Sequence, residues 1–160
     1  METVLIVENH PAMSHWLARV VHQCHPKARI VMLNGGPDLY AAVDYYRPDL
    51  VFMDVRLAGL NGLEATRVLK SRGFRAPIVI LTNSGLPEYR QAALECGAAR
   101  CLVNGDVRES DIVDILFDVD LNDSAPFDEH RPEDDAATRS LRQPGTSLPV
   151  SYYTSDAADE

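Results

Sequence analysis

The chain has 160 residues, the size of one domain with a terminal extension. Hydrophobic residues make up 46% and charged residues 24%, as in an ordinary globular protein, and no apolar run approaches the ~20 residues that span a bilayer. The formal net charge of −9 disfavours direct binding to nucleic-acid phosphates. Three cysteines without CxxC spacing argue against a disulfide framework and a zinc site, and they fit a reducing cytoplasm.

Short apolar runs alternate with segments of helical periodicity along the first 121 residues. In chain order, strands are expected at 4–7, 30–33, 50–53, 78–81 and 101–103, and helices at 11–23, 38–46, 63–72, 87–96 and 106–118. Strands that are apolar throughout are typical of a parallel sheet covered on both faces. The alternation therefore predicts an α/β fold, a doubly wound five-stranded parallel sheet with five helices.

The pattern ends near residue 121, which divides the chain into a domain at 1–121 and an acidic segment at 122–160. The domain carries a net charge of −3 and the segment carries −6. Because the segment is rich in acids and prolines and poor in large apolar residues, it is expected to be a disordered tail. Residues 149–154 (PVSYYT) are its one apolar and aromatic piece, and docking of this piece on the domain or on a partner is the alternative.

Polar side chains directly follow several of the predicted strands. Glu8 and Asn9 follow the first strand, Asp54 the third, Thr82 the fourth and Asn104 the fifth. In doubly wound folds, ligands bind outside the carboxyl ends of the strands, near the point where the strand order reverses. Two acids and a hydroxyl are therefore expected to converge at one edge of the sheet.

These residues lie in motifs that resemble the receiver domain of response regulators. Residues 4–11 (VLIVENHP) are similar to its opening, 48–57 (PDLVFMDVRL) to its phosphoacceptor strand and 77–82 (PIVILT) to its switch-threonine strand. The loop at 59–64 (GLNGLE) and the helix end at 92–98 also match, so that the resemblance covers about residues 3–120 in consistent order. It implies the flavodoxin-like receiver fold and a signalling role in two-component phosphorelays, without an enzymatic activity of its own.

The resemblance also assigns roles to individual residues. Asp54 stands at the phosphoacceptor position, which takes a phosphoryl group from a histidine kinase or a histidine phosphotransfer protein. Thr82 stands at the switch hydroxyl. The family binds Mg²⁺ at positions that correspond here to Glu8, Asn9, Asp54 and the backbone carbonyl of Arg56.

The pocket departs from the family pattern at two of these positions. Asn9 replaces an acid that usually binds the metal, and Asn104 replaces a lysine that usually pairs with the phosphoryl oxygens. Loss of one acid and one base leaves the charge of the empty pocket unchanged, but Mg²⁺ is expected to bind weakly and phosphorylation to be less well transmitted. His10, beside the acids, is a candidate contact for a phosphoryl group or a partner.

Two functions remain open. The first is a single-domain receiver that signals to an unknown downstream protein, with a homodimer through the fourth helix, fifth strand and fifth helix as a further option. The second is a phosphorylation-independent pseudo-receiver that acts as a constitutive interaction module. The His-Pro at 10–11 resembles regulators that carry a helix-turn-helix, but no such domain follows, so no DNA binding, no membrane association and a cytoplasmic location are expected.

Overall fold

The computed structural model describes residues 1–123 and 151–153. The main sheet contains β1 (Thr3–Val7), β2 (Arg29–Leu33), β3 (Leu50–Asp54), β6 (Ile78–Thr82), β7 (Arg100–Val103) and β8 (Ser151–Tyr153). A small antiparallel ribbon is formed by β4 (Arg56–Leu57) and β5 (Leu60–Asn61). The helices are α1 (Pro11–Cys24), α2 (Leu39–Tyr46), α3 (Gly62–Ser71), α4 (Pro87–Glu95) and α5 (Glu109–Asp123).

The strand order of the main sheet is β7-β6-β3-β1-β2-β8. In this sheet β1, β2, β3, β6 and β7 pair in parallel, and β8 pairs antiparallel with β2. The order of the parallel strands is that of flavodoxin-like folds. The prediction of a doubly wound parallel sheet of five strands with five helices is therefore confirmed, and β8 is an addition at its edge.

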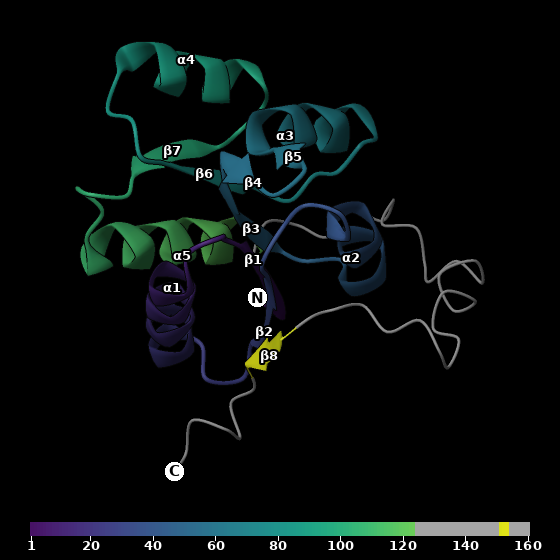
Figure 1. Ribbon diagram of the computed structural model, residues 1–160. Coiled ribbons are helices and arrows are strands. Elements are labelled where there is room, and N and C mark those ends of the chain that lie inside the picture. Colours follow the sequence, from purple (N-terminus) through teal and green to yellow (C-terminus); the bar gives the residue numbers. More distant parts are fainter. Residues whose placement is uncertain (124–150, 154–160) are drawn as a thin grey trace.

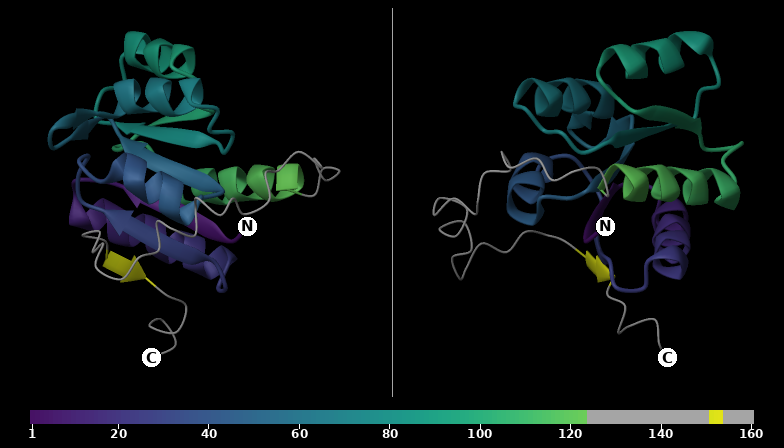
Figure 2. Two further views of the ribbon diagram at one scale, coloured as in Figure 1. Left: turned by 90° about the vertical axis from the view of Figure 1, so that its right-hand side faces the viewer. Right: turned by 180° about the vertical axis from the view of Figure 1, so that it is seen from behind.

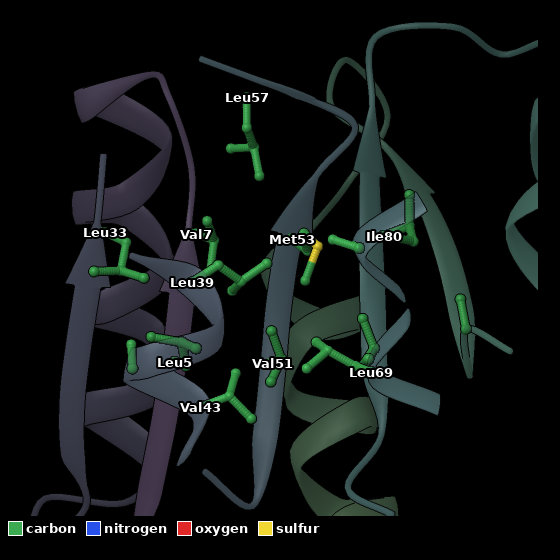
Figure 3. Packing of buried hydrophobic residues seen from close by; sticks show 14 of the residues in the cluster. Leu5, Val7, Leu33, Leu39, Val43, Val51, Met53, Leu57, Leu69 and Ile80 are labelled. Carbon is green, nitrogen blue, oxygen red and sulfur yellow. The ribbon is translucent and has the colours of Figure 1, made fainter. Parts of the chain in front are cut away.

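Two apolar layers hold the helices against the sheet. Alternate residues of each strand face opposite sides, so that Leu5 and Val7 of β1 join one cluster while Val4 and Ile6 join the other. Helices α2 and α3 cover the first cluster, and α1 and α5 lie side by side over the second (Figures 1 and 2). Figure 3 shows side chains of the first cluster packed between the sheet and its helices. Within the described ranges, none of the helices has the length and apolar character that a membrane crossing requires.

The last helix begins later than its periodicity predicts. After β7, residues 104–107 form a turn in which the Asp106 N–H donates to the Val103 carbonyl at 2.9 Å. The Arg108 N–H then donates to the Asp111 carboxylate at 2.8 Å, which caps the first turn of α5. The helix continues to residue 123, slightly beyond the boundary expected at 121.

The strand order places the switch point between β1 and β3. From β1 the chain crosses through α1 to β2 on one side, and it then returns through α2 to β3 on the other side. The two connections leave on opposite faces, as the clusters under α1 and α2 indicate. The carboxyl ends of β1 and β3 therefore border the crevice in which such folds bind ligands.

Strand β8 occupies the edge of the sheet beside β2. Residues 151–153 pair antiparallel with residues 30–32, which gives the sheet a final strand on that side (Figure 1). This pairing supports docking of part of the piece at 149–154, the alternative to a tail that is disordered throughout. Residues 124–150 and 154–160 lie outside the described residues. Because an open edge strand invites pairing with other chains, β8 protects β2.

Deletion of residues 124–160 is expected to lower the melting temperature by less than about 5 °C, roughly 1 kcal/mol for a domain of this size. Both described apolar clusters end by residue 119, so the deletion leaves them complete. The Arg29 N–H points toward β1, where it donates to the Glu2 carbonyl, so the alternating N–H groups of Ile30 and Met32 point toward β8. Hydrogen exchange should accelerate at Ile30 and Met32 in the truncated chain, and unchanged protection there would contradict the pairing.

Candidate functional site

Two buried carboxyl groups meet at the switch point. Glu8 directly follows β1 and Asp54 ends β3, and these strands are neighbours in the sheet. The two residues are only 1% and 2% exposed. Asp54 Oδ1 accepts a hydrogen bond of 3.2 Å from the backbone N–H of Arg56. The other oxygens, Glu8 Oε2 and Asp54 Oδ2, are buried and accept no hydrogen bond from any part of the protein that the structure describes.

The environment of Glu8 changes its protonation. Burial raises its pKa from 4.5 to about 7, and the neighbouring carboxyl group of Asp54 adds to this effect. Hydrogen bonds from His10 act in the opposite direction on the same pKa. Near neutral pH the pair Glu8 and Asp54 therefore holds a proton in a large fraction of molecules, which relieves repulsion between the two carboxylates.

His10 completes a group of three potential metal ligands. Its Nδ1 lies 3.1 Å from Glu8 Oε1 and 4.0 Å from Asp54 Oδ2, and its backbone N–H donates to Glu8 Oε1 at 3.2 Å. One ligand atom from each residue lies within 4.8 Å of the others. From the sequence, His10 was expected only as a contact for a phosphoryl group or a partner. The Glu-x-His spacing after a strand was the signal for a ligand role, because it allows both side chains to reach one edge.

The Asn9 side chain lies outside the pocket that the Glu8 side chain enters. It lies between Glu8 and His10 but is exposed to solvent, whereas Glu8 is buried. Successive side chains at a strand end point in opposite directions, so burial of Glu8 directs Asn9 away from the core. A ligand role for Asn9 would need its side chain to turn toward the pocket.

Thr82 and Asn104 lie at the ends of neighbouring strands. Thr82 is 4% exposed, and its Oγ1 accepts a hydrogen bond of 3.1 Å from the backbone N–H of Ser84. Because a hydroxyl that accepts one bond still has a proton to donate, Thr82 keeps its donor capacity. The side-chain amide of the half-buried Asn104 donates to Oδ1 of the exposed Asn83 at 2.7 Å, a contact that residue spacing did not predict.

The loop after Asp54 is fixed by a close backbone contact. Gly62 begins α3, and its N–H donates to the Val55 carbonyl at 2.8 Å. An added Cβ at Gly62 would lie 2.1 Å from the Asp54 carbonyl oxygen. Asn61 caps the helix, since its Oδ1 accepts from the Leu63 N–H at 2.8 Å. The β4–β5 ribbon and this glycine together set the backbone position of Asp54 and of Arg56, whose carbonyl is a predicted metal ligand.

The donor set is compatible with a hard divalent cation. Mg²⁺ prefers oxygen ligands and usually binds through one or two carboxylates while keeping several waters. Glu8 Oε2 and Asp54 Oδ2 are buried oxygens without a partner among the described residues, and a cation would satisfy both. The residues present therefore fit Mg²⁺, although the site offers one fewer charged ligand than an Asp at position 9 would supply.

Comparison with known sequences identifies related proteins. The sequence profile described as "Response regulator receiver domain" matches residues 4–116. A protein-glutamate methylesterase/protein-glutamine glutaminase from Syntrophus aciditrophicus (strain SB) is 32% identical over 115 residues, covering 69% of this chain and 32% of that protein. Response regulator GacA from Pseudomonas aeruginosa is 27% identical over 105 residues, covering 66% of this chain and 49% of GacA. The chain thus spans about a third to a half of the length of these curated relatives.

Solved structures show the same fold. The signal receiver domain of a DNA binding response regulator from Colwellia psychrerythraea 34H has a TM-score of 0.69 at 18% identity, covering 75% of this chain and 99% of that chain. Chemotaxis response regulator CheY4 of Vibrio cholerae has a TM-score of 0.65 at 21% identity, covering 74% of this chain and 98% of that chain. At these identities the similarity establishes the fold alone.

Proposed function

Because the chain belongs to the response regulator receiver domain family, we propose that it accepts a phosphoryl group on Asp54 and signals through contacts with other proteins. Receiver domains act in two-component signalling with histidine kinases or phosphotransfer proteins. The observation that carries the assignment is Asp54 Oδ2, a buried carboxylate oxygen at the switch crevice that has no hydrogen-bond partner among the described residues. Its sister oxygen Oδ1 is already held by the Arg56 N–H.

The transfer would use these two oxygens differently. Oδ2 of Asp54 attacks the phosphorus of a phosphohistidine, the P–N bond breaks as the O–P bond forms, and the donor histidine leaves with the electron pair of that bond. Oδ1 stays on the Arg56 N–H, which orients the carboxylate. The hydroxyl of Thr82 then donates its free proton to a phosphoryl oxygen and draws the loop after β6 toward Asp54.

A bound Mg²⁺ would neutralise negative charge between the carboxylates and the phosphoryl group. In this proposal Glu8, Asp54 and the Arg56 carbonyl would hold the ion, and Asn9 would be a neutral ligand if its side chain turned inward. Weak binding follows, because the amide of Asn9 carries no charge and because Glu8 holds a proton in part of the population at neutral pH.

The signalling surface of this proposal lies on the side of α4, β7 and α5. Large apolar side chains are exposed there: Leu86, Tyr89, Leu94, Val113, Phe117 and Leu121. Exposed apolar side chains on these elements are available for contact with a downstream protein or with a second copy of the chain. The net charge of −9 disfavours duplex DNA as a direct ligand.

The proposed function is tested by the mass of the intact protein after incubation with Mg²⁺ and acetyl phosphate. The wild type should gain the mass of one phosphoryl group, and Asp54→Asn should gain none. Asp44→Asn, which changes an exposed aspartate on α2, is the matched control and should behave as the wild type. Equal mass gain in the wild type and in Asp54→Asn would contradict the assignment.

A constitutive interaction module is the second candidate, and one contact favours it. The Asn104 amide is engaged with Asn83 at 2.7 Å, and position 104 itself carries no positive charge. A chain of this second kind would gain no phosphoryl mass under the same conditions. It would also bind its partners equally well as wild type and as Asp54→Asn.

Restoring the family residues through Asn9→Asp with Asn104→Lys is expected to tighten Mg²⁺ binding roughly tenfold and to raise the level of phosphorylated Asp54. The aspartate adds an anionic ligand, and the lysine adds an ammonium for the phosphoryl oxygens. Asn104→Lys alone should weaken Mg²⁺ binding, because it adds positive charge without a ligand, so the two effects should not add.

Calorimetry measures the metal affinity of these variants, and intact mass measures their phosphorylation. Asn34→Asp is the control, since it adds the same charge at an exposed position after β2. A wild type that already matches the double variant in both measurements would show that Asn9 and Asn104 do not weaken the pocket.

A further inference from the structure

The group formed by Glu8, His10 and Asp54 offers a nitrogen ligand beside two oxygen ligands. We propose that these three side chains form a site for a borderline divalent transition ion, and that Zn²⁺ binds there more tightly than Mg²⁺. The inference deepens the proposed function and rests on it in one respect: the ion would occupy the pocket in which Asp54 accepts the phosphoryl group. The cysteine spacing argued against a thiolate zinc site, but it does not bear on a site of carboxylates and imidazole.

The chemistry of the ligands favours a transition ion. Carboxylates alone suit Mg²⁺, whereas imidazole is a common ligand of Zn²⁺ and of its first-row neighbours and is seldom used for Mg²⁺. Two of the three residues are almost fully buried, and each keeps an oxygen without a hydrogen-bond partner among the described residues. A cation bound at these oxygens would compensate their burial, which buried carboxyl groups otherwise meet by pairing or by protonation.

The distances fit one ion. Zn²⁺ lies about 2.0–2.2 Å from nitrogen and oxygen ligands, so two ligand atoms of a tetrahedral site lie roughly 3.3–3.6 Å apart. His10 Nδ1 is 3.1 Å from Glu8 Oε1 and 4.0 Å from Asp54 Oδ2. The first distance is just below this range and the second is just above it. Small side-chain adjustments of less than about 1 Å would therefore close the site without a change of backbone.

The backbone holds His10 in place for this role. His10 precedes Pro11 and has the extended conformation that a following proline requires, with φ −102° and ψ 113°. Its N–H is bound to Glu8 Oε1, so the residue is tied to the carboxylate beside which it would bind. The His10 side chain is 61% exposed, which leaves the outer side of the site open for water or a phosphoryl oxygen.

Calorimetric titration with Zn²⁺ and with Mg²⁺, without any phosphodonor, tests the site. The wild type should bind one Zn²⁺ at least about tenfold more tightly than Mg²⁺. His10→Gln should lose about tenfold or more in Zn²⁺ affinity while its Mg²⁺ affinity changes by less than about threefold. Two controls, His15→Gln at an exposed position of α1 and Cys24→Ser at an exposed thiol, should bind Zn²⁺ as the wild type does.

Nitrogen-15 spectra of the imidazole groups locate the bound ion. Among the 5 histidines of the chain, His10 should shift first on addition of Zn²⁺, with the larger change at Nδ1. Unchanged Zn²⁺ affinity in His10→Gln, or an earlier shift at another histidine, would overturn the inference. If Asp54 is still phosphorylated with Mg²⁺ in that case, the proposed function stands; if Zn²⁺ binds as expected but no phosphorylation occurs, the proposed function fails and the metal site stands.

Discussion

Replacing Glu8 by glutamine is expected to remove a large fall in folding stability that the wild type shows between about pH 4.5 and about pH 7. The pKa of Glu8 is raised to about 7 in the folded protein, from the ordinary value of 4.5 that a glutamate has in an unfolded chain. Between these values the folded state holds a proton that the unfolded state has lost, so the free energy of unfolding decreases as the pH rises. Above the folded pKa the loss is complete and amounts to on the order of 3 kcal/mol.

The measurement is urea denaturation from pH 4.5 to pH 8 in the presence of a chelator. Glutamine keeps the shape of Glu8 without its charge, so Glu8→Gln should be more stable than the wild type at pH 8 and nearly equal to it at pH 4.5. Glu2→Gln changes an exposed glutamate just before the start of β1 and is the control. Its free energy of unfolding should change with pH in parallel with that of the wild type. If Glu8→Gln also ran parallel to the wild type, Glu8 would have an ordinary pKa.

Replacing Gly62 by alanine is expected to destabilise the fold by about 2–3 kcal/mol or more and to reduce phosphorylation of Asp54. The new Cβ would lie 2.1 Å from the Asp54 carbonyl oxygen and 3.0 Å from its carbonyl carbon. Both atoms belong to the backbone, so no side-chain rotation relieves the clash. The end of β3 or the start of α3 must move, and either change displaces the Asp54 carboxylate.

Gly85→Ala is the matched control for this substitution. A Cβ at Gly85 has no atom within 4 Å, and its backbone does not need a positive φ. Its free energy of unfolding should therefore stay within about 0.5 kcal/mol of the wild type. Urea denaturation compares the three proteins, and equal stability of Gly62→Ala and Gly85→Ala would show that Gly62 is not a tight contact.

The sheet was the part of the fold that sequence patterns predicted best. Apolar runs such as residues 50–53 are buried on both faces, and burial on both faces is what makes a run continuous. The strand β8 could be suggested only as a docking piece, because three residues have no periodicity that separates a strand from a turn. The start of α5 was also misplaced, since the turn at 104–107 depends on hydrogen bonds to Val103.

The candidate site was predictable in its backbone positions and less so in its side chains. Glu8 and Asp54 meet as expected because parallel strands end at one edge of the sheet. The placement of His10 Nδ1 beside the two carboxyl groups and the exposure of Asn9 depend on local rotation after β1, which residue spacing does not fix. The bond between Asn104 and Asn83 likewise depends on which amides lie within reach once the strands have paired.

Covalent phosphorylation of Asp54 is the step on which the proposed signalling by this chain depends most directly. An aspartyl phosphate is reduced by borohydride to homoserine, so treatment with Mg²⁺ and acetyl phosphate followed by borohydride marks the acceptor residue. Peptide mass spectrometry should find homoserine at position 54 and at neither Asp49 nor Asp44. Homoserine at another aspartate, or at none while the intact mass stays unchanged, would contradict the assignment of Asp54 as the phosphoacceptor.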